Sequence, residues 1–175
     1  MRVARVKAVE YKYCPLCGGK LVGEKEERRK RKVCGKCGFR YYPRAATAVG
    51  GVIVKGDRVL LARRGKEPGR GKWMFPAGFM EFGESPEETL ARELKEETGL
   101  GVKKAVLWYV TTSYDDPREK VVINMFFKVE TTGKESNDDE GENLEIGFKK
   151  IGVKMKMAFN PHKWAWKKLA EEGEA

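Results

Sequence analysis

Three glutamates lie close together near the middle of the chain, at Glu93, Glu96 and Glu97. In a helix, residues three and four apart lie on one face, so these carboxylates would gather within one arc. Like charges at that spacing repel one another, and hard divalent cations, which prefer oxygen ligands, would offset the repulsion. The spacing therefore indicates a metal site. An acidic helix face is also commonly just a solvated surface, so spacing alone does not decide between the two.

Four cysteines form a second group able to do chemistry, as two Cys-x-x-Cys pairs at Cys14, Cys17, Cys34 and Cys37. Two such pairs at this separation are typical of zinc sites, because Zn²⁺ takes four thiolates in a tetrahedron. The single histidine, His162, is distant in sequence, so we expect an all-cysteine ligand set. A closed site of this kind is structural, since no position is left for water. Disulfides or a duplicated redox pair are the weaker alternatives.

The three glutamates need a helix, and the surrounding sequence supplies both of its ends. Ser85 is a favourable N-cap, Pro86 suits the first helical position, and Glu88 completes a capping box. Gly99 is typical of the position just after a helix. The sequence therefore predicts a helix between Ser85 and Gly99.

The remaining elements follow from runs of β-branched and aromatic residues bounded by turn residues. The predicted strands are 47–55, 58–63, 73–76, 103–112, 121–130 and 144–151, with a hairpin turn at 56–57 and loops over 64–72 and 132–143. In the first strand we expect four residues to be buried: Val49, Val52, Ile53 and Val54. Asn160 as N-cap, followed by Pro161, predicts a C-terminal helix over 163–172.

The charge divides the chain near Arg44. Residues 1–44 hold 14 basic and 4 acidic side chains, whereas residues 45–175 hold 22 of each. We therefore predict a small cysteine-containing domain over 1–44 and a larger domain over 45–175. A basic patch attracts polyanions, nucleic acid included, although a solvated surface is the more common outcome.

Composition excludes several classes of protein. Hydrophobic residues make up 41% of the 175 residues, which is enough for a packed core and argues against global disorder. The longest strongly apolar run, 48–54, is far shorter than the roughly 20 residues of a membrane span, so we expect no membrane partner. The charged residues 1–5 have no apolar stretch behind them, so we expect no secretory signal and a cytoplasmic protein.

The segment 78–100 resembles the signature of the Nudix hydrolase family, G-x5-E-x7-R-E-U-x-E-E-x-G-U, in which U is apolar. All nine fixed positions are filled, by Gly78, Glu84, Arg92, Glu93, Leu94, Glu96, Glu97, Gly99 and Leu100. The resemblance covers about residue 46 onward. It implies an α+β fold, the Nudix fold, with a mixed sheet in an α/β/α sandwich, here preceded by a small N-terminal four-cysteine zinc ribbon. It also implies hydrolysis of a nucleoside diphosphate linked to another group.

The resemblance implies a catalytic Mg²⁺ or Mn²⁺ in addition to the structural Zn²⁺. By position, Glu93 and Glu97 would be the principal metal ligands. Glu96 would be a further ligand or relay, and the carbonyl of Ala77 would also bind metal. Arg92 would orient the neighbouring carboxylates.

The resemblance implies that Glu84 supports the site by holding the metal ligands or through a water molecule, and that the general base lies in a later loop. The available carboxylates are Asp138, Asp139, Glu140, Glu142 and Glu145. We favour Glu142, with Glu145 second, because the run 142–148 looks like the E-x-x-E-apolar pattern often found there. We expect a structural role for His162 rather than that of the base.

A four-cysteine ribbon ahead of the domain is similar to two Nudix groups. One is the NADH pyrophosphatases, whose downstream marker S-Q-P-W-P-F-P-x-S is absent at 107–116. The other is a group similar to FAD/ADP-ribose pyrophosphatases, which the run 63–84 resembles. We therefore expect ADP-ribose or FAD as substrate, with release of AMP, rather than NADH.

Other roles stay open at this point. Arg63, Arg64 and Arg70 are candidates to contact the phosphates. Three aromatic residues either stack on a base or, as we favour, pack in the core or on the sheet surface: Trp108, Tyr109 and Tyr114. An RNA 5′-end, cap-type pyrophosphohydrolase would use the basic ribbon to hold RNA. A non-catalytic nucleotide- or nucleic-acid-binding protein is the third class, and the intact signature argues against it. The ribbon is also a candidate contact for a homodimer, because many Nudix enzymes pair.

Overall fold

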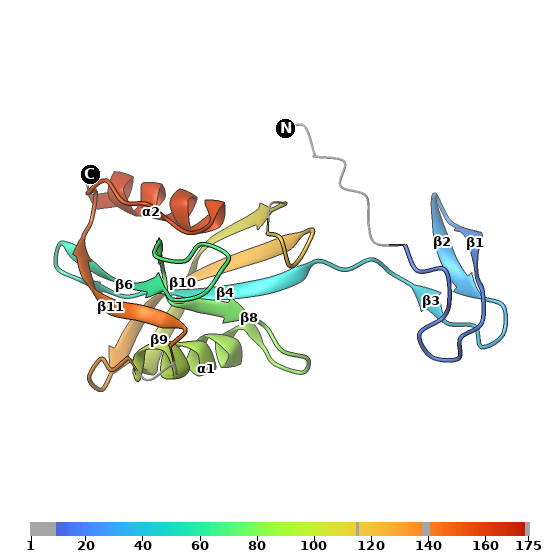
Figure 1. Ribbon diagram of the computed structural model, residues 1–175, viewed down its shortest axis with the longest axis horizontal. Coiled ribbons are helices and arrows are strands. Elements are labelled where there is room, and N and C mark those ends of the chain that lie inside the picture. The colour runs from blue at the N-terminus through green and yellow to red at the C-terminus, as the bar shows by residue number, and fades with distance from the viewer. Residues whose placement is uncertain (1–9, 115, 138–140, 174–175) are drawn as a thin grey trace. The chain divides into compact units, whose positions relative to one another are not determined.

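The computed structural model describes residues 10–114, 116–137 and 141–173. The chain divides after Arg44 into two compact units, and each is described by itself (Figure 1). We call the first unit the ribbon and the second, which begins at Ala45, the α+β unit. Among the described residues, no helix has the length and apolar character needed to cross a membrane.

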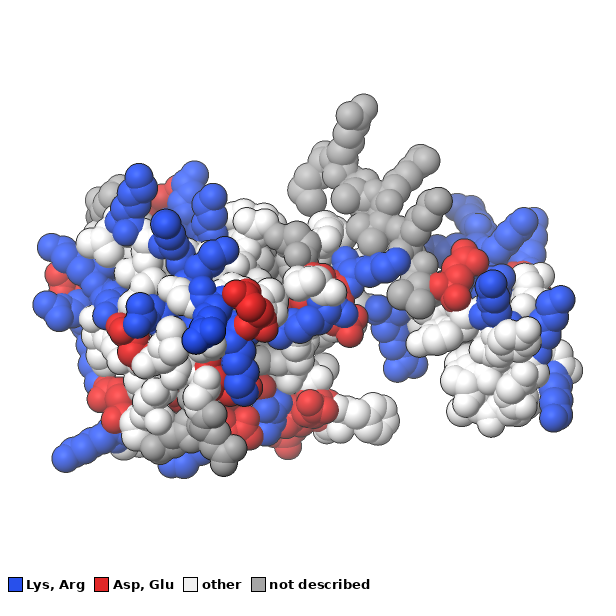
Figure 2. Space-filling view, viewed as in Figure 1, with Lys and Arg blue, Asp and Glu red and all other residues white. Residues whose placement is uncertain are grey.

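The ribbon is an antiparallel sheet ordered β1–β2–β3. Its strands are β1 (Leu21–Glu26), β2 (Arg29–Cys34) and β3 (Arg40–Tyr41). Our sequence reading missed them, because the charged run 24–32 lacks the apolar alternation that marks a half-buried strand. Figure 2 shows Lys and Arg side chains gathered over the β1–β2 hairpin.

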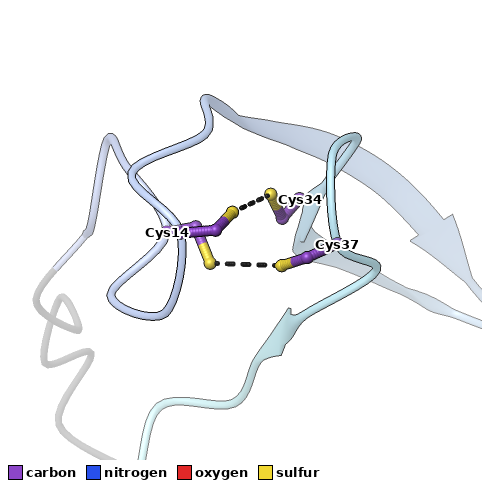
Figure 3. A group of neighbouring side chains, drawn as sticks. Cys14, Cys34 and Cys37 are labelled. Atoms are coloured by element: carbon purple, nitrogen blue, oxygen red, sulfur yellow. Dashed lines mark hydrogen bonds between the residues drawn. The ribbon is translucent and has the colours of Figure 1, made fainter.

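The interior of the ribbon is small and contains two of the cysteines. Cys14, Leu21 and Cys34 are its buried members. Figure 3 shows Cys14 and Cys34 on segments that face one another. These few apolar side chains supply little hydrophobic stabilisation. A unit of this size therefore depends on a bound metal or a similar cross-link.

The α+β unit contains two sheets and the helices that cover them. Its elements are β4 (Ala46–Val52), β5 (Val54–Lys55), β6 (Arg58–Arg64), β7 (Trp73–Met74), β8 (Ala77–Phe79), α1 (Pro86–Thr98), β9 (Gly101–Ser113), β10 (Val122–Thr132), β11 (Asn143–Lys150) and α2 (Asn160–Gly173). One sheet has the order β8–β4–β10–β9, and the other has the order β11–β6–β5, with β7 paired to β6. Strands β4 and β10 run parallel while β9 and β8 are antiparallel to their neighbours, so the first sheet is mixed, as predicted.

The strand predicted over 47–55 is two strands that belong to different sheets. Strand β4 ends at Val52 and β5 begins at Val54. Val52 and Ile53 are both buried, because their side chains pack in different hydrophobic clusters, Val52 with Trp166 and Ile53 with Leu90. The prediction that Val54 is buried was wrong, since it is 41% exposed. The predicted turn at 56–57 is confirmed by the pairing of Lys55 with Arg58.

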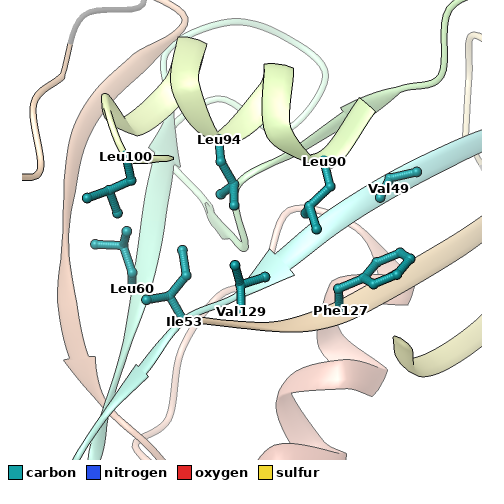
Figure 4. Close-up of a cluster of buried hydrophobic side chains, with 8 residues drawn as sticks. All are labelled: Val49, Ile53, Leu60, Leu90, Leu94, Leu100, Phe127 and Val129. Atoms are coloured by element: carbon teal, nitrogen blue, oxygen red, sulfur yellow. The ribbon is translucent and has the colours of Figure 1, made fainter. Parts of the chain in front are cut away.

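Helices α1 and α2 cover opposite faces of the mixed sheet. Leu90 and Leu94 of α1 pack in a cluster with Phe127 of β10 (Figure 4). Trp166 of α2 packs in a second cluster with Phe126. Because neighbouring residues of a strand point to opposite faces, the two clusters lie on opposite sides of β10. Figure 1 shows α2 above the strands and α1 below them, which is the predicted α/β/α arrangement.

The ends of α1 are those that the sequence predicts. The backbone N–H of Glu88 donates to the Ser85 hydroxyl oxygen at 3.2 Å, and the N–H of Ser85 donates to the Glu88 carboxylate at 2.8 Å. Gly99 ends the helix in the left-handed region, at φ 70°. This reciprocal cap fixes where α1 starts, and so which of its turns face β8.

Candidate active site and zinc centre

Arg92 joins carboxylates from α1 and from the loop before it. Its Nε and Nη2 donate to the two oxygens of Glu84 at 2.7 and 2.9 Å. Its Nη1 donates to Glu93 at 2.6 Å and to Glu96 at 3.2 Å, and Nη2 also reaches the carbonyl of Phe79 at 3.0 Å. A planar guanidinium used in this way holds the loop, the helix and β8 in one geometry.

Glu84 is held as an anion by these contacts. The hydrogen bonds from Arg92 lower the pKa of Glu84 to about 2, and the backbone N–H of Glu81 contributes to the same shift. The hydroxyl of Thr89 also donates to Glu84, at 2.8 Å. Glu84 is thus a fixed negative charge that positions Arg92, which suits the supporting role that the family resemblance implies.

Glu93 lies directly against the backbone of β8. A Cβ added at Gly78 would overlap the Glu93 carboxylate, so this approach requires glycine. The Glu93 side chain is only 13% exposed, and burial raises its pKa above the ordinary value. A buried carboxylate in this state gains from a nearby cation, which would favour its charged form.

Glu97 is buried between α1 and the same strand, with 4% of its surface exposed. Its Oε2 accepts a hydrogen bond from the backbone N–H of Ala77 at 2.8 Å. Glu97 is therefore a direct neighbour of the residue whose carbonyl is predicted to bind metal.

A cavity of about 200 Å³ opens between β8, α1 and the end of β6. Its charged lining is Glu93, Glu97, Glu142, Arg64, Lys66 and Arg118. Carboxylates suit hard cations, whereas arginine and lysine suit phosphate oxygens. Glu96, with 57% of its side chain exposed, lies outside this lining, and it shares the guanidinium of Arg92 with Glu93.

The structure separates the two carboxylates favoured as the base. Glu142 lines the cavity and lies 3.1 Å from the Nζ of Lys66. Glu145 instead pairs with Arg63 and Lys149, each at 3.2 Å. The other candidates, Asp138, Asp139 and Glu140, lie outside the described residues.

The three arginines predicted to contact phosphates have different surroundings. Arg64 lines the cavity, where its Nε donates to the carbonyl of Pro68 at 2.9 Å and its guanidinium lies 5.1 Å from the ring centroid of Phe159. Arg63 is engaged with Glu145 instead. Arg70 is exposed.

Our sequence reading missed Arg118, which lines the same cavity. Asp116 holds its guanidinium with two hydrogen bonds, at 3.0 and 2.8 Å. The guanidinium lies over the rings of Phe79 and Phe159, at 4.8 and 5.6 Å from their centroids. The only local signal was an Asp-Pro-Arg turn, which by itself says nothing about distance from the glutamates.

A smaller cavity of about 60 Å³ adjoins the first and shares Arg64, Phe79 and Arg118 with it. His162 forms part of its wall. The Nδ1 of His162 accepts from the backbone N–H of Phe75 at 3.1 Å, and burial lowers the pKa of His162 to about 3. The buried ring and its hydrogen bond to the backbone fit the structural role predicted for His162.

The sulfur atoms of Cys14, Cys17, Cys34 and Cys37 all lie within 4.8 Å of one another. The separation is 3.6 Å from Cys14 to Cys37 and 3.5 Å from Cys17 to Cys34 (Figure 3). A backbone hydrogen bond from Cys37 lowers the pKa of Cys34 to about 7, which favours the thiolate that zinc binds. Four converging sulfurs fit a closed tetrahedral Zn²⁺ site.

We expect Cys34→Ser to lose the bound zinc and to unfold the ribbon while leaving part of the hydrolytic activity. Cys34 is only 1% exposed, and a hydroxyl is a poor substitute for a thiolate ligand. Zinc content per chain and protease sensitivity of the first 44 residues measure the two effects. Lys36→Ser, an exposed change in the same knuckle, is the control. Unchanged zinc in Cys34→Ser would exclude that cysteine as a ligand.

This fold, in which the carboxylates of α1 lie against β8 at Gly78, is that of the Nudix hydrolases. The family model described as the NUDIX domain matches residues 44–166. The chain therefore belongs to the Nudix hydrolase family.

Two relatives are similar to this protein over much of its chain. A protein named ADP-ribose pyrophosphatase, from Methanocaldococcus jannaschii, is 37% identical over 126 residues, which are 71% of this chain and 73% of that protein. A protein named NAD-capped RNA hydrolase NudC, from Pectobacterium carotovorum, is 32% identical over 139 residues, which are 79% of this chain. The aligned region spans only 50% of that NudC.

Solved structures agree on the fold. A NUDIX hydrolase from Nitrosomonas europaea superposes with a TM-score of 0.71 at 29% identity, covering 93% of this chain and 92% of that one. The NUDIX domain of Shewanella oneidensis NrtR, solved with ADP ribose, has a TM-score of 0.63 at 19% identity. That match covers 75% of this chain and 90% of the other, and shows the shared fold alone.

Proposed function

We propose that the protein hydrolyses the pyrophosphate bond of ADP-ribose or FAD and releases AMP. The observation that carries the proposal is the single cavity whose lining combines Glu93 and Glu97 with three basic residues, Arg64, Lys66 and Arg118. A pyrophosphate needs cations beside its oxygens and also donors that hold it, and this cavity offers groups for both. The similarity to an ADP-ribose pyrophosphatase supports this choice of substrate.

The residues around β8 fit Mg²⁺ or Mn²⁺. Glu93, Glu97 and the carbonyl of Ala77 supply oxygen donors, which these ions prefer, with Glu96 as a further donor at the edge. Burial raises the pKa of Glu93, and a cation beside it would favour the charged carboxylate. When bound, such ions neutralise phosphate charge and lower the pKa of a coordinated water.

The remaining charged residues would bind the phosphates and accept the proton of the attacking water. Arg64 and Arg118 would hold the phosphate oxygens, since both are already fixed, by Pro68 and by Asp116. Glu142 would accept a proton from the attacking water. Its place in the same cavity lining as the α1 glutamates supports that role.

We expect Glu142→Gln to lower kcat by about 10²-fold, because a general base contributes on that scale, with little change in KM. Glu145→Gln is the matched control, being the same substitution three positions along, on a residue paired with Arg63 and Lys149. Steady-state kinetics on ADP-ribose check both. Loss of activity in Glu145→Gln alone would move the base to the second candidate.

We expect Arg118→Gln to raise KM by about 10- to 100-fold, the effect of losing a charged hydrogen bond to phosphate, with a smaller effect on kcat. Arg70→Gln removes an exposed arginine from the same unit and serves as the control. A KM unchanged by Arg118→Gln would remove this residue from the substrate contacts.

Product analysis tests the proposed function as a whole. The purified protein with Mg²⁺ is offered ADP-ribose, FAD, NAD⁺, NADH and nucleoside triphosphates, beside Glu97→Gln. AMP released from ADP-ribose or FAD by the wild type alone supports the proposal. Absence of turnover on both would overturn it.

A second candidate is hydrolysis at the 5′ end of RNA. The similarity to NudC and the excess of basic side chains before Arg44 favour it, although the chain spans only half of that relative. Turnover of RNA that falls steeply with salt, while turnover of the free dinucleotide does not, would distinguish this candidate from the first.

We further propose a cytoplasmic location, where zinc-binding thiols stay reduced. The homodimer suggested by the family resemblance stays a prediction. A single monomeric mass in solution would contradict it.

A further inference from the structure

The register of the ribbon sheet separates its charges onto two faces. Opposite partners in an antiparallel pair lie on the same face, so Glu24 shares a face with Arg31. On that face Arg31 lies 3.4 Å from Glu26, and Arg40 lies 3.2 Å from Glu24 and 3.4 Å from Glu26. The carboxylates of β1 are therefore neutralised by neighbouring arginines.

The other face of the sheet carries lysines without carboxylates from the strands. Lys25 pairs with Lys30, and Lys32 lies between Gly23 and Tyr41 in the register. Like charges directly opposite one another are unfavourable in a sheet. An anion bound beside them would relieve that cost.

A cavity of about 320 Å³ includes four residues of this face in its lining, and the full lining is Glu10, Gly23, Lys30, Arg31, Lys32, Tyr41 and Pro43. A Cβ added at Gly23 would meet nothing within 4 Å, so the space above the strand is open. The ring of Tyr41 is held edge-on against another tyrosine ring, Tyr11, with centroids 4.9 Å apart. The cavity thus combines fixed aromatic surface with positive charge.

One carboxylate reaches the rim of this cavity without cancelling its charge. Glu10 lies 3.9 Å from Lys32, and its side chain is 78% exposed. A contact that long and that exposed to solvent contributes little. The cavity therefore keeps a net positive charge.

We propose that this cavity binds a single-stranded nucleic acid, with phosphates at Lys30 and Lys32 and a base against Tyr41. Basic side chains beside an aromatic ring are the combination by which proteins bind single strands, since every base has a face that can stack. A duplex offers phosphates but no unstacked base, so the ring favours a single strand. This binding goes beyond the proposed hydrolysis and does not depend on it.

Fluorescence anisotropy of the full-length protein with an uncapped oligo(U) of about ten nucleotides tests the phosphate contacts. We expect Lys30→Gln/Lys32→Gln to weaken binding by at least about 10-fold near 100 mM salt. It should also flatten the slope of log K against log salt by about 1.4, because each single-strand phosphate contact contributes roughly 0.7. Lys12→Gln/Lys20→Gln removes the same charge from exposed ribbon positions outside the cavity lining, and should change affinity about twofold or less.

The tyrosine is tested separately. We expect Tyr41→Leu to weaken binding by about 10-fold without changing the salt slope, because it removes stacking and no charge. Tyr41→Phe should keep the affinity of the wild type. Zinc content confirms that the ribbon is folded in each variant.

Three further probes decide the class of ligand. Binding of oligo(dT) with the same loss in the cavity variants supports a single-strand site shared by RNA and DNA. Equal affinity for a duplex or for heparin, with no effect of Tyr41→Leu, would overturn the proposal and leave a general polyanion surface. Equal losses in the two lysine pairs would also overturn it. If ADP-ribose is not hydrolysed while oligo(U) binding follows the expected pattern, the proposed function fails and this inference stands.

Discussion

Glu97→Gln is expected to lower the rate of ADP-ribose hydrolysis by on the order of 10²-fold or more, with the fold and the zinc content unchanged. The side chain is buried and accepts a hydrogen bond from Ala77, and the amide oxygen of glutamine can accept the same bond. The substitution therefore removes negative charge from the cavity while keeping the packing. Initial rates at saturating Mg²⁺, together with circular dichroism and zinc analysis, measure the three quantities.

The matched control for this variant is Glu87→Gln, the same substitution at an exposed position in the first turn of α1. It should keep the wild-type rate within about twofold, because surface changes away from the site have small effects. Near-native turnover of Glu97→Gln at saturating Mg²⁺ would exclude Glu97 as a metal ligand.

Gly78→Ala is expected to reduce the rate by a similar factor without touching a charged group. The added methyl overlaps the Glu93 carboxylate, so that side chain must move away from β8. A shift of about 1 Å in a catalytic group can cost about 10²-fold in rate. Gly147→Ala is the control, since its Cβ would meet only the end of Lys149, at 4.0 Å.

A double-mutant cycle shows whether Gly78 acts through Glu93. If it does, Gly78→Ala added to Glu93→Gln should cost little beyond Glu93→Gln alone, since the affected carboxylate is already gone. Fully additive losses would instead mean that the methyl disturbs β8 itself, and thermal denaturation of Gly78→Ala would then show a lowered Tm.

Sequence alone predicted α1 and its caps well, because their signals are local. Ser85, Glu88 and Gly99 each act on backbone groups within one turn. The boundary between β4 and β5 was not predicted, because it depends on which sheet the chain pairs with on each side of Val52 and Ile53. The apolar run looks the same whether it stays in one sheet or passes between two.

The residues of the candidate site also divide into those that local spacing predicts and those that depend on the tertiary fold. Helical spacing and the family signature predicted that Glu93 and Glu97 share one region, and both line one cavity. Arg118 reaches that cavity from a loop after β9, by a path that depends on how β9 and β10 pair. No spacing in the chain encodes that path. The exposure of Arg70, in contrast to Arg64, likewise depends on how the loop after β6 folds back.

The parallel pairing of β4 with β10 also sets the order in which the protein can fold as it leaves the ribosome. Ala46 pairs with Val122 and Val52 with Lys128, so the middle of the mixed sheet waits for the synthesis of distant residues. The β1–β2 hairpin and the cysteine pairs involve near neighbours in sequence, and they are complete once β3 has emerged. The four cysteines can therefore converge, ready for the Zn²⁺ that their geometry fits, on a nascent chain whose α+β unit is still unfolded.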